Sequence, residues 1–136
     1  MKYLVTGATG FLGRRLVAKL LARANATVYV LIRRASADKM DDLRTRLEAD
    51  ESRLIPVWGD ITRDGVIDSA AVERLAGEID HVFHLAAVYD MDMSDATADL
   101  FNVKGTANVL ALAGALSNAN KTKPKFHHMS SVAVAG

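Results

Sequence analysis

The chain has 136 residues, enough for one domain, and half of them are hydrophobic while 24% are charged. That balance allows a packed globular core. The formal net charge is +1 and the basic residues form no long tract, so nothing indicates a nucleic-acid partner. The chain has no cysteine, which excludes disulfides, zinc–thiolate sites and thiol nucleophiles. This composition is compatible with a reducing cytoplasm, where we expect the protein to reside.

Apolar runs and helical patterns alternate along the chain. We expect strands at residues 3–6, 27–32, 54–58, 80–85 and 125–129. We expect helices from residue 11, at 38–49, at 67–75 and at 95–116, the last with an apolar stripe of Leu100, Val103, Ala107, Leu110 and Gly114. Five alternations predict one α/β domain over residues 1–136. Its sheet is a Rossmann-type, doubly wound parallel sheet with strand order 3-2-1-4-5. No apolar stretch reaches the roughly 20 residues of a transmembrane helix, and Gly7 interrupts the first run, so we expect neither a membrane span nor a signal peptide.

A glycine-rich turn follows the first strand and carries the strongest functional signal. It reads Thr6-Gly7-Ala8-Thr9-Gly10-Phe11-Leu12-Gly13 and opens an amphipathic helix. In this context Gly7 allows a sharp turn, Gly10 lets the backbone approach a pyrophosphate, and Gly13 lets the helix pack on the sheet. The N–H groups at the start of the helix suit phosphate. We therefore predict a dinucleotide site that includes Gly7, Thr9, Gly10, Phe11, Leu12 and Gly13.

The end of the second strand indicates which dinucleotide binds. NAD-binding versions usually place Asp or Glu there to hold the ribose hydroxyls. Here Ile32 is followed by Arg33 and Arg34, whose planar guanidiniums suit the 2′-phosphate of NADP(H). NADP(H) is the predicted cofactor. The alternative is that both arginines are solvated loop residues.

Further candidate site residues follow the third, fourth and fifth strands. Asp60 can accept from the adenine amino group beside the Ile61 backbone, or it can be a turn or helix-capping residue. Small residues after the fourth strand allow a ribose and diphosphate to lie against the backbone, and the predicted contacts there are Leu85, Ala86 and Ala87. Asn102 lies one helical turn before Thr106, where its amide can brace the active-site backbone or belong to a polar stripe. Within each pair, His81 and His84, or His127 and His128, the side chains point to opposite faces of the sheet, so no metal site is predicted.

Five motifs agree in order and spacing with a known family. They are Thr6-Gly7-x-x-Gly10-x-x-Gly13, Asp60-Ile61, His84-x-Ala86-Ala87, Asn102-Val103-x-Gly105-Thr106 and Ser130-Ser131. Over its whole length the chain resembles the extended short-chain dehydrogenase/reductase family. Residues 80–91 and 126–136 resemble bacterial fatty acyl-CoA reductases most.

The resemblance implies hydride transfer from NADPH to a fatty acyl-CoA thioester, giving an aldehyde with loss of coenzyme A, or an alcohol after a second reduction. It makes Ser131 the catalytic serine that holds the carbonyl oxygen. In the family a tyrosine donates the proton and a lysine four residues later lowers its pKa. The three tyrosines here, Tyr3, Tyr29 and Tyr89, are followed four positions later by Gly7, Arg33 and Met93. We therefore expect the Tyr-x-x-x-Lys pair beyond Gly136, in a longer reductase of which this chain is the N-terminal, inactive part.

Two alternatives stay open at this point. One is another enzyme of the extended family, such as a sugar-nucleotide epimerase or a ketone or aldehyde reductase. Arg33 and Arg34 disfavour epimerases, which usually hold NAD through an acidic residue. The other is a non-catalytic NADP-binding sensor, which the presence of Ser131 disfavours. Relatives of the family are often dimers, so the resemblance also allows a homo-oligomer.

Overall fold

The computed structural model describes residues 1–85, 100–117 and 123–129. Five parallel strands form one sheet with the order β3-β2-β1-β4-β5. The strands are β1 (Lys2–Thr6), β2 (Thr27–Ile32), β3 (Leu54–Trp58), β4 (His81–His84) and β5 (Lys125–His128). The helical elements are α1 (Phe11–Leu21), η1 (Arg34–Ser36), α2 (Ala37–Leu47), α3 (Ser69–Leu75), the π-helical turn η2 (Leu100–Lys104) and α5 (Gly105–Ala115). The predicted fold class and strand order are confirmed.

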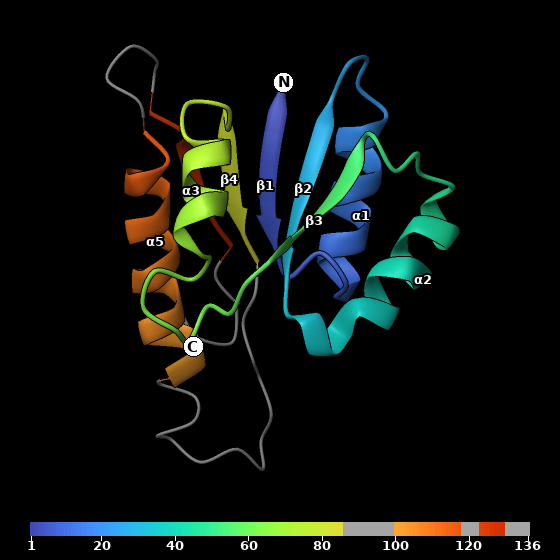
Figure 1. The fold of residues 1–136 in the computed structure, drawn as a ribbon. Coiled ribbons are helices and arrows are strands. Elements are labelled where there is room, and N and C mark those ends of the chain that lie inside the picture. The colour runs from blue at the N-terminus through green and yellow to red at the C-terminus, as the bar shows by residue number, and fades with distance from the viewer. Residues whose placement is uncertain (86–99, 118–122, 130–136) are drawn as a thin grey trace.

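Helices cover the sheet on both faces, as Figure 1 shows, with α1 and α2 on one side and α3 and α5 on the other. The strands supply alternate residues to two cores, because successive side chains point to opposite faces. Val28 and Val30 of β2 belong to the core under α1 and α2, whereas Leu31 belongs to the core under α3 and α5. All strands run in the same direction, so their carboxyl ends meet at one edge, the lower edge in Figure 1.

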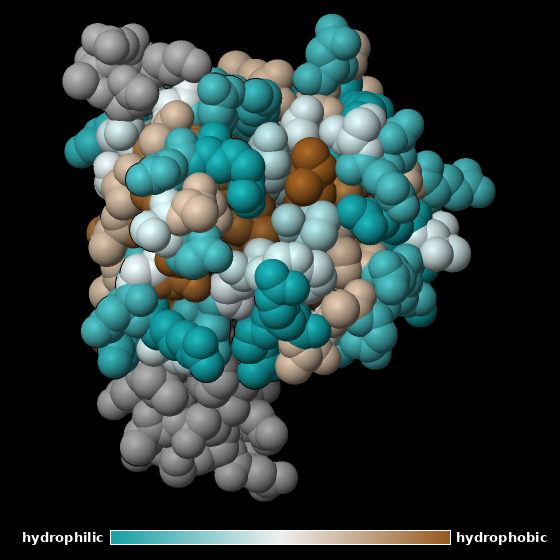
Figure 2. Space-filling model, viewed as in Figure 1, coloured by the Kyte–Doolittle hydropathy of each residue, from teal (hydrophilic) through white to brown (hydrophobic). Residues whose placement is uncertain are grey.

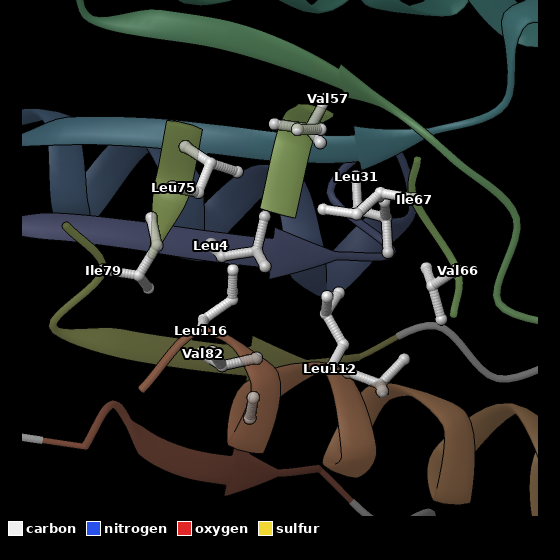
Figure 3. Close-up of a cluster of buried hydrophobic side chains, with 13 residues drawn as sticks. Leu4, Leu31, Val57, Val66, Ile67, Leu75, Ile79, Val82, Leu112 and Leu116 are labelled. Carbon is white, nitrogen blue, oxygen red and sulfur yellow. The ribbon is translucent and has the colours of Figure 1, made fainter. Parts of the chain in front are cut away.

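The core under α3 and α5 is assembled from most of the chain. Figure 3 shows Leu4, Leu31, Val57 and Val82 from four strands meeting Leu75 of α3 and Leu112 and Leu116 at α5. Leu4, Val82 and Leu116 have no exposed surface. Contacts between segments so distant in sequence make the sheet and its helices one packed unit. On the face seen in Figure 2, by contrast, hydrophilic side chains predominate and hydrophobic ones form small separate areas.

Two of the predicted helices differ from the observed ones. The helix predicted at 67–75 begins at Ser69, because the Asp68 side chain accepts from the Ala71 N–H at 2.8 Å and caps it, while Ile67 packs in the core. Of the apolar residues noted at helical spacing, Val103 of η2 and Leu110 of α5 are 67% and 55% exposed, so this set is not the buried side of the helix. The buried residues of α5 are Gly105, Val109, Leu112 and Ala113. This helix is apolar on nearly all sides, so periodicity does not identify the side that packs. Residues 95–99 of the predicted helix lie outside the described part.

None of the described helices is long and apolar enough to cross a membrane.

Candidate functional site: a nucleotide cleft at the carboxyl edge of the sheet

The turn between β1 and α1 is built by its glycines. Gly7 has a φ of 73°, in the left-handed region that favours glycine. The Gly10 N–H donates to the Gly7 carbonyl at 3.2 Å, and the Arg14 N–H donates to the Gly10 carbonyl at 3.0 Å, so the turn leads directly into α1. No acidic residue lies in the first turn of α1. The helix N-terminus is therefore free of the negative charge that would oppose a phosphate.

Gly13 and Gly10 are restricted for different reasons. A Cβ on Gly13 would lie 1.9 Å from the Gly7 carbonyl oxygen and 2.8 Å from the Ala8 Cα, so any side chain there would collide with backbone. A Cβ on Gly10 would meet nothing closer than the Gly7 oxygen at 3.4 Å. Gly13 is thus required by the fold, because it packs against the turn; the predicted contact was with the sheet. Gly10 is exposed and open, which fits the prediction that its surface is kept clear for a ligand.

The ends of β2 and β3 enclose a pocket of about 690 Å³. Its charged lining consists of Arg33, Arg34 and Arg63 together with Asp60, Asp64 and Asp68. The parallel register pairs Ile32 with Trp58, so the predicted arginines follow β2 where β3 also ends. Arg33 and Arg34 are both exposed, and the Arg34 Cζ lies 5.2 Å from the centre of the Trp58 ring. Among the described residues neither arginine takes part in an ion pair.

Asp60 has the turn role that was its alternative in the sequence. Its Oδ1 accepts from the Thr62 hydroxyl at 2.6 Å and from the Thr62 N–H at 2.9 Å. The Thr62 hydroxyl, and more weakly its N–H and the charges of Arg33 and Arg63, hold the pKa of Asp60 below its usual range against the opposing effect of burial. Asp60 is therefore ionised at neutral pH. One oxygen is committed to the turn, and its predicted contact with adenine stays a prediction.

A strained backbone forms part of the same pocket. Val66 has a φ of 65°, which is unusual for a β-branched residue. Its carbonyl accepts from the Asp60 N–H at 3.0 Å, and a Cβ on Gly59 would lie 2.6 Å from the Val66 oxygen. The close approach of Gly59 and Val66 holds the segment after β3 in place. Residues 59–67 are thus a fixed wall of the pocket.

Asn108 ties this wall to α5. Its side-chain amide donates to the Ile61 carbonyl at 2.8 Å and to the Arg63 carbonyl at 3.2 Å. Ile61 also packs on α5, because a Cβ on Gly105 would lie 2.9 Å from the Ile61 Cδ1. The Ile61 carbonyl is therefore engaged by the protein, which leaves other parts of its backbone for the predicted adenine contact. The sequence analysis missed Asn108; its helical spacing of three from Gly105 is the only signal that links it to the family motif.

A buried hydrogen-bond chain fixes the carboxyl ends of β1 and β4. The His84 Nδ1 lies 2.7 Å from the Thr6 hydroxyl oxygen, and the His84 Nε2 lies 3.1 Å from the Thr106 hydroxyl oxygen. Thr106 donates its only proton to the Asn102 carbonyl at 2.7 Å, so it accepts from the His84 Nε2–H. The Nδ1 of a neutral His84 then accepts from the Thr6 hydroxyl. His84 therefore has the Nε2–H tautomer.

Burial, and secondly the neighbouring His128, lower the pKa of His84 to about 4. The imidazole is 1% exposed, and it is neutral near pH 7. The chain His84–Thr106–Asn102 links β4 to the start of α5, with Thr106 and Asn102 on one helical face as predicted. The Asn102 main-chain carbonyl forms this link, and the bracing role of the Asn102 amide stays a prediction. The sequence analysis gave His84 no role.

A second pocket, of about 740 Å³, lies between α1 and the strands β4 and β5. Two predicted cofactor residues, Leu12 and Leu85, line it together with Phe83, His127 and Met129. The Leu85 N–H donates to both the carbonyl and the hydroxyl of Thr6 at 3.2 Å. Leu85 is thus fixed next to the glycine turn.

The remaining two predicted residues of the glycine turn lie at the surface or near it. Phe11 is 64% exposed, with the Arg15 Cζ 4.4 Å from its ring centre, and Thr9 is half-buried.

The histidines pair between strands and not within them. The His81 Nδ1 lies 3.0 Å from the His127 Nε2 on the α1 face, and His84 stacks on His128 at 5.4 Å on the other face. Burial, with the nearby His127 and Lys125, lowers the pKa of His81. The described residues contain no group of three or more His, Cys, Asp or Glu side chains that could hold a metal ion.

Three predicted site residues, Ala86, Ala87 and Ser131, lie outside the described residues. The predicted residues that the structure does describe fall into two groups at the carboxyl edge. The glycine turn and Leu85 lie at β1 and β4, whereas Arg33, Arg34, Asp60 and Ile61 lie at β2 and β3. A parallel sheet with a glycine turn before its first helix, and with basic residues after its second strand, defines a dinucleotide-binding domain of the Rossmann class.

Comparison with known proteins specifies the family. The model of an NAD-binding family, described as male sterility protein, matches residues 5–136. The chain belongs to this family, and the solved structures similar to it include reductase domains and a short-chain type dehydrogenase/reductase. The predicted resemblance is therefore confirmed.

Individual relatives agree with this assignment. The chain is 34% identical over 134 residues to fatty acyl-CoA reductase 8 of Arabidopsis thaliana, covering 81% of the chain and 27% of that enzyme. Among solved structures, it matches the terminal R domain of the myxalamid PKS-NRPS biosynthetic pathway with a TM-score of 0.77 and 33% identity, over 98% of the chain and 35% of that domain. It matches Gre2 from Candida albicans, solved in complex with NADPH, with a TM-score of 0.74 and 29% identity, over 98% of the chain and 38% of Gre2. The chain thus spans about a quarter to two fifths of these relatives.

Proposed function

We propose that the chain is the NADP(H)-binding part of a cytoplasmic reductase that converts a fatty acyl-CoA thioester to an aldehyde or alcohol. One observation carries the choice of cofactor. Two exposed guanidiniums, without ion-pair partners among the described residues, line a pocket after β2 at the edge that also carries the glycine turn. In the NAD-binding pattern a carboxylate would occupy this place.

The described residues fit a dinucleotide along this edge. The start of α1 offers N–H groups and no acidic side chain, and Gly10 leaves room for a pyrophosphate. Arg33 and Arg34 offer donors that match the 2′-phosphate. Asp60 and Ile61 are held in position for the adenine by Thr62 and Asn108. Bound NADPH would supply the hydride for the reduction.

The acyl-CoA substrate rests on the resemblance to fatty acyl-CoA reductases and on their sequence identity to this chain. We propose that Ser131 holds the substrate carbonyl oxygen, as the family motif implies. The 136 residues contain no tyrosine followed by lysine four positions later. The proton donor of the reaction is therefore assigned outside these residues, and we expect them to bind the cofactor without turnover.

Calorimetric titration with NADPH and NADH at low salt tests the cofactor assignment. We expect tighter binding of NADPH, and we expect Arg33→Ala to reduce NADPH affinity about tenfold, because charge-assisted hydrogen bonds contribute about 1.5–3 kcal/mol. NADH affinity should change less than about twofold. Arg46→Ala is the matched control, because Arg46 is an exposed arginine on α2 paired with Asp42, and it does not line the pocket.

Equal affinities for NADPH and NADH would contradict the proposal and favour an NAD-dependent member of the extended family. Turnover of a fatty acyl-CoA by the 136 residues alone would contradict the assignment of the proton donor. Aldehyde production by a longer protein that contains this chain, and its loss in Ser131→Ala, are the results expected for the proposed reaction.

A further inference from the structure

Trp58 stands apart from the residues assigned so far. It is the last residue of β3 and the only tryptophan of the chain, and it is half-buried against the core under α1 and α2. It pairs in register with Ile32, the last residue of β2, so it lies directly beside the point where the two arginines begin. It lies outside the five family motifs. Trp58 therefore needs a separate explanation.

The Trp58 ring is in contact with Arg34. The Arg34 Cζ lies 5.2 Å from the ring centre, within the range of a cation–π interaction. Arg34 is the first residue of η1, and it is exposed. A free arginine side chain has many rotamers, and their entropy is lost when it binds a phosphate. A ring that already restricts the guanidinium reduces this loss.

The charges around the pocket show why Arg34 needs such support. Three carboxylates line the same pocket, from Asp60, Asp64 and Asp68. Asp60 already interacts with Arg33 and Arg63, whose charges help to lower its pKa. An arginine drawn into an ion pair with one of these carboxylates would lose phosphate-binding capacity. Contact with Trp58 restrains the Arg34 guanidinium, which stays exposed and forms no ion pair among the described residues.

We propose that Trp58 is a positioning residue for NADP(H) selectivity, which holds the Arg34 guanidinium where the 2′-phosphate binds. The inference rests on the proposed function, since it requires that NADP(H) occupies this pocket. Its effect is confined to ligands that carry the 2′-phosphate. The part of the site that holds adenine, around Asp60 and Ile61, is positioned by Thr62 and Asn108 and not by Trp58.

Two small ligands isolate the relevant end of the cofactor. Adenosine 2′,5′-bisphosphate carries the 2′-phosphate, and adenosine 5′-monophosphate lacks it. Calorimetric titrations with both would compare the wild type with Arg34→Ala, Trp58→Leu, Trp58→Phe and the double variant Arg34→Ala/Trp58→Leu. Arg46→Ala serves as the surface control, and circular dichroism melting verifies that each variant folds.

We expect Trp58→Leu to weaken binding of the bisphosphate about threefold to fivefold, equivalent to about 0.6–1 kcal/mol, and to change monophosphate binding less than about twofold. Trp58→Phe should retain most of the affinity, because it keeps an aromatic face. The double variant should bind no more weakly than Arg34→Ala, because Trp58 acts through Arg34. Trp58 emission in the wild type should change on addition of the bisphosphate but not of the monophosphate. This last measurement needs no substitution.

Different results overturn different claims. Equal weakening of both ligands in Trp58→Leu would show that the ring stacks on adenine, and additive losses in the double variant would show that it acts without Arg34; either result overturns the inference alone. The inference is also overturned, without the proposed cofactor, if Trp58→Leu binds the bisphosphate as tightly as the wild type. The same holds if Trp58 emission does not change although calorimetry detects bisphosphate binding. A wild type that does not prefer the bisphosphate overturns the proposed cofactor and this inference with it.

Discussion

Two regions at the same edge of the sheet are built in opposite ways. The turn between β1 and α1 is made of backbone, with Gly7 in a left-handed conformation and Gly13 pressed against the preceding turn. The pocket at the ends of β2 and β3 is made of side chains, with Arg33 and Arg34 exposed at its rim. In the first region the backbone atoms that build the fold are also those proposed to contact the ligand. In the second, the proposed ligand-binding side chains lie at the surface above the packed core. Substitutions there can therefore change ligand preference with little effect on stability.

The substitution Gly13→Ala tests the first region most severely. The new Cβ would lie 1.9 Å from the Gly7 oxygen, and that backbone atom cannot move without distorting the turn. We expect a loss of about 3 kcal/mol in the free energy of unfolding, measured by urea denaturation. The matched control is Gly114→Ala on α5, where the new Cβ meets nothing within 4 Å. This change should stabilise the protein by about 0.5–1 kcal/mol, and a loss for Gly13→Ala no larger than about 0.5 kcal/mol would contradict the account.

Acid should weaken the support beneath the same turn, where His84 accepts from Thr6. The folded-state pKa of His84 is about 4, below the ordinary value of 6.5. As pH falls from 6.5 towards 4, the unfolded chain takes up a proton that folded His84 does not, so stability falls. This difference corresponds to about 3 kcal/mol once the pH is below both values. Urea denaturation at several pH values from 7 to 4 measures it.

His84→Gln should remove the largest single part of the pH dependence in this range; His81, whose pKa burial also lowers, contributes in the same direction. If the free energy of unfolding of His84→Gln depended on pH as steeply as that of the wild type, the pH dependence would arise from other groups.

Asn108→Ala tests how the wall of the second region is held. The change removes the bonds from α5 to the Ile61 and Arg63 carbonyls. We expect about 1 kcal/mol of destabilisation and weaker binding of both NADPH and NADH, since the adenine part of the site is common to both. Ser117→Ala, which removes a single long bond of 3.4 Å to Ala113, should have little effect on either quantity. If Asn108→Ala left nucleotide binding unchanged, residues 59–67 would keep their position without the Asn108 hydrogen bonds.

Gly10→Ala should have the smallest effect on stability, which sharpens the contrast with Gly13. A Cβ at this position meets the Gly7 oxygen at an ordinary 3.4 Å. We expect a loss below about 1 kcal/mol together with a loss of more than about tenfold in NADPH affinity, because the methyl group would occupy the space proposed for the pyrophosphate. Parallel denaturation and calorimetry separate the two effects. Retained NADPH affinity would place the pyrophosphate elsewhere.

The same contrast explains what could be predicted from the sequence. Backbone features carry local signals, so the five strands and their order were predicted correctly, as was the sharp turn at Gly7. Features that depend on tertiary contacts were not. The contact of Arg34 with Trp58 joins the ends of two strands, and the bonds of Asn108 span more than forty positions. The buried side of α5 could not be identified from the sequence, because apolar residues surround that helix.

The collision at Gly13 also has an evolutionary consequence. In proteins descended from this chain, Gly13 cannot be replaced by a residue with a side chain unless the β1–α1 connection also changes. The position is therefore constrained to glycine. The exposed arginines after β2 are under no such packing constraint. If Arg33 and Arg34 set the cofactor as proposed, cofactor preference in descendants of this chain can shift by single surface replacements that leave the protein folded, while the glycine turn is inherited unchanged.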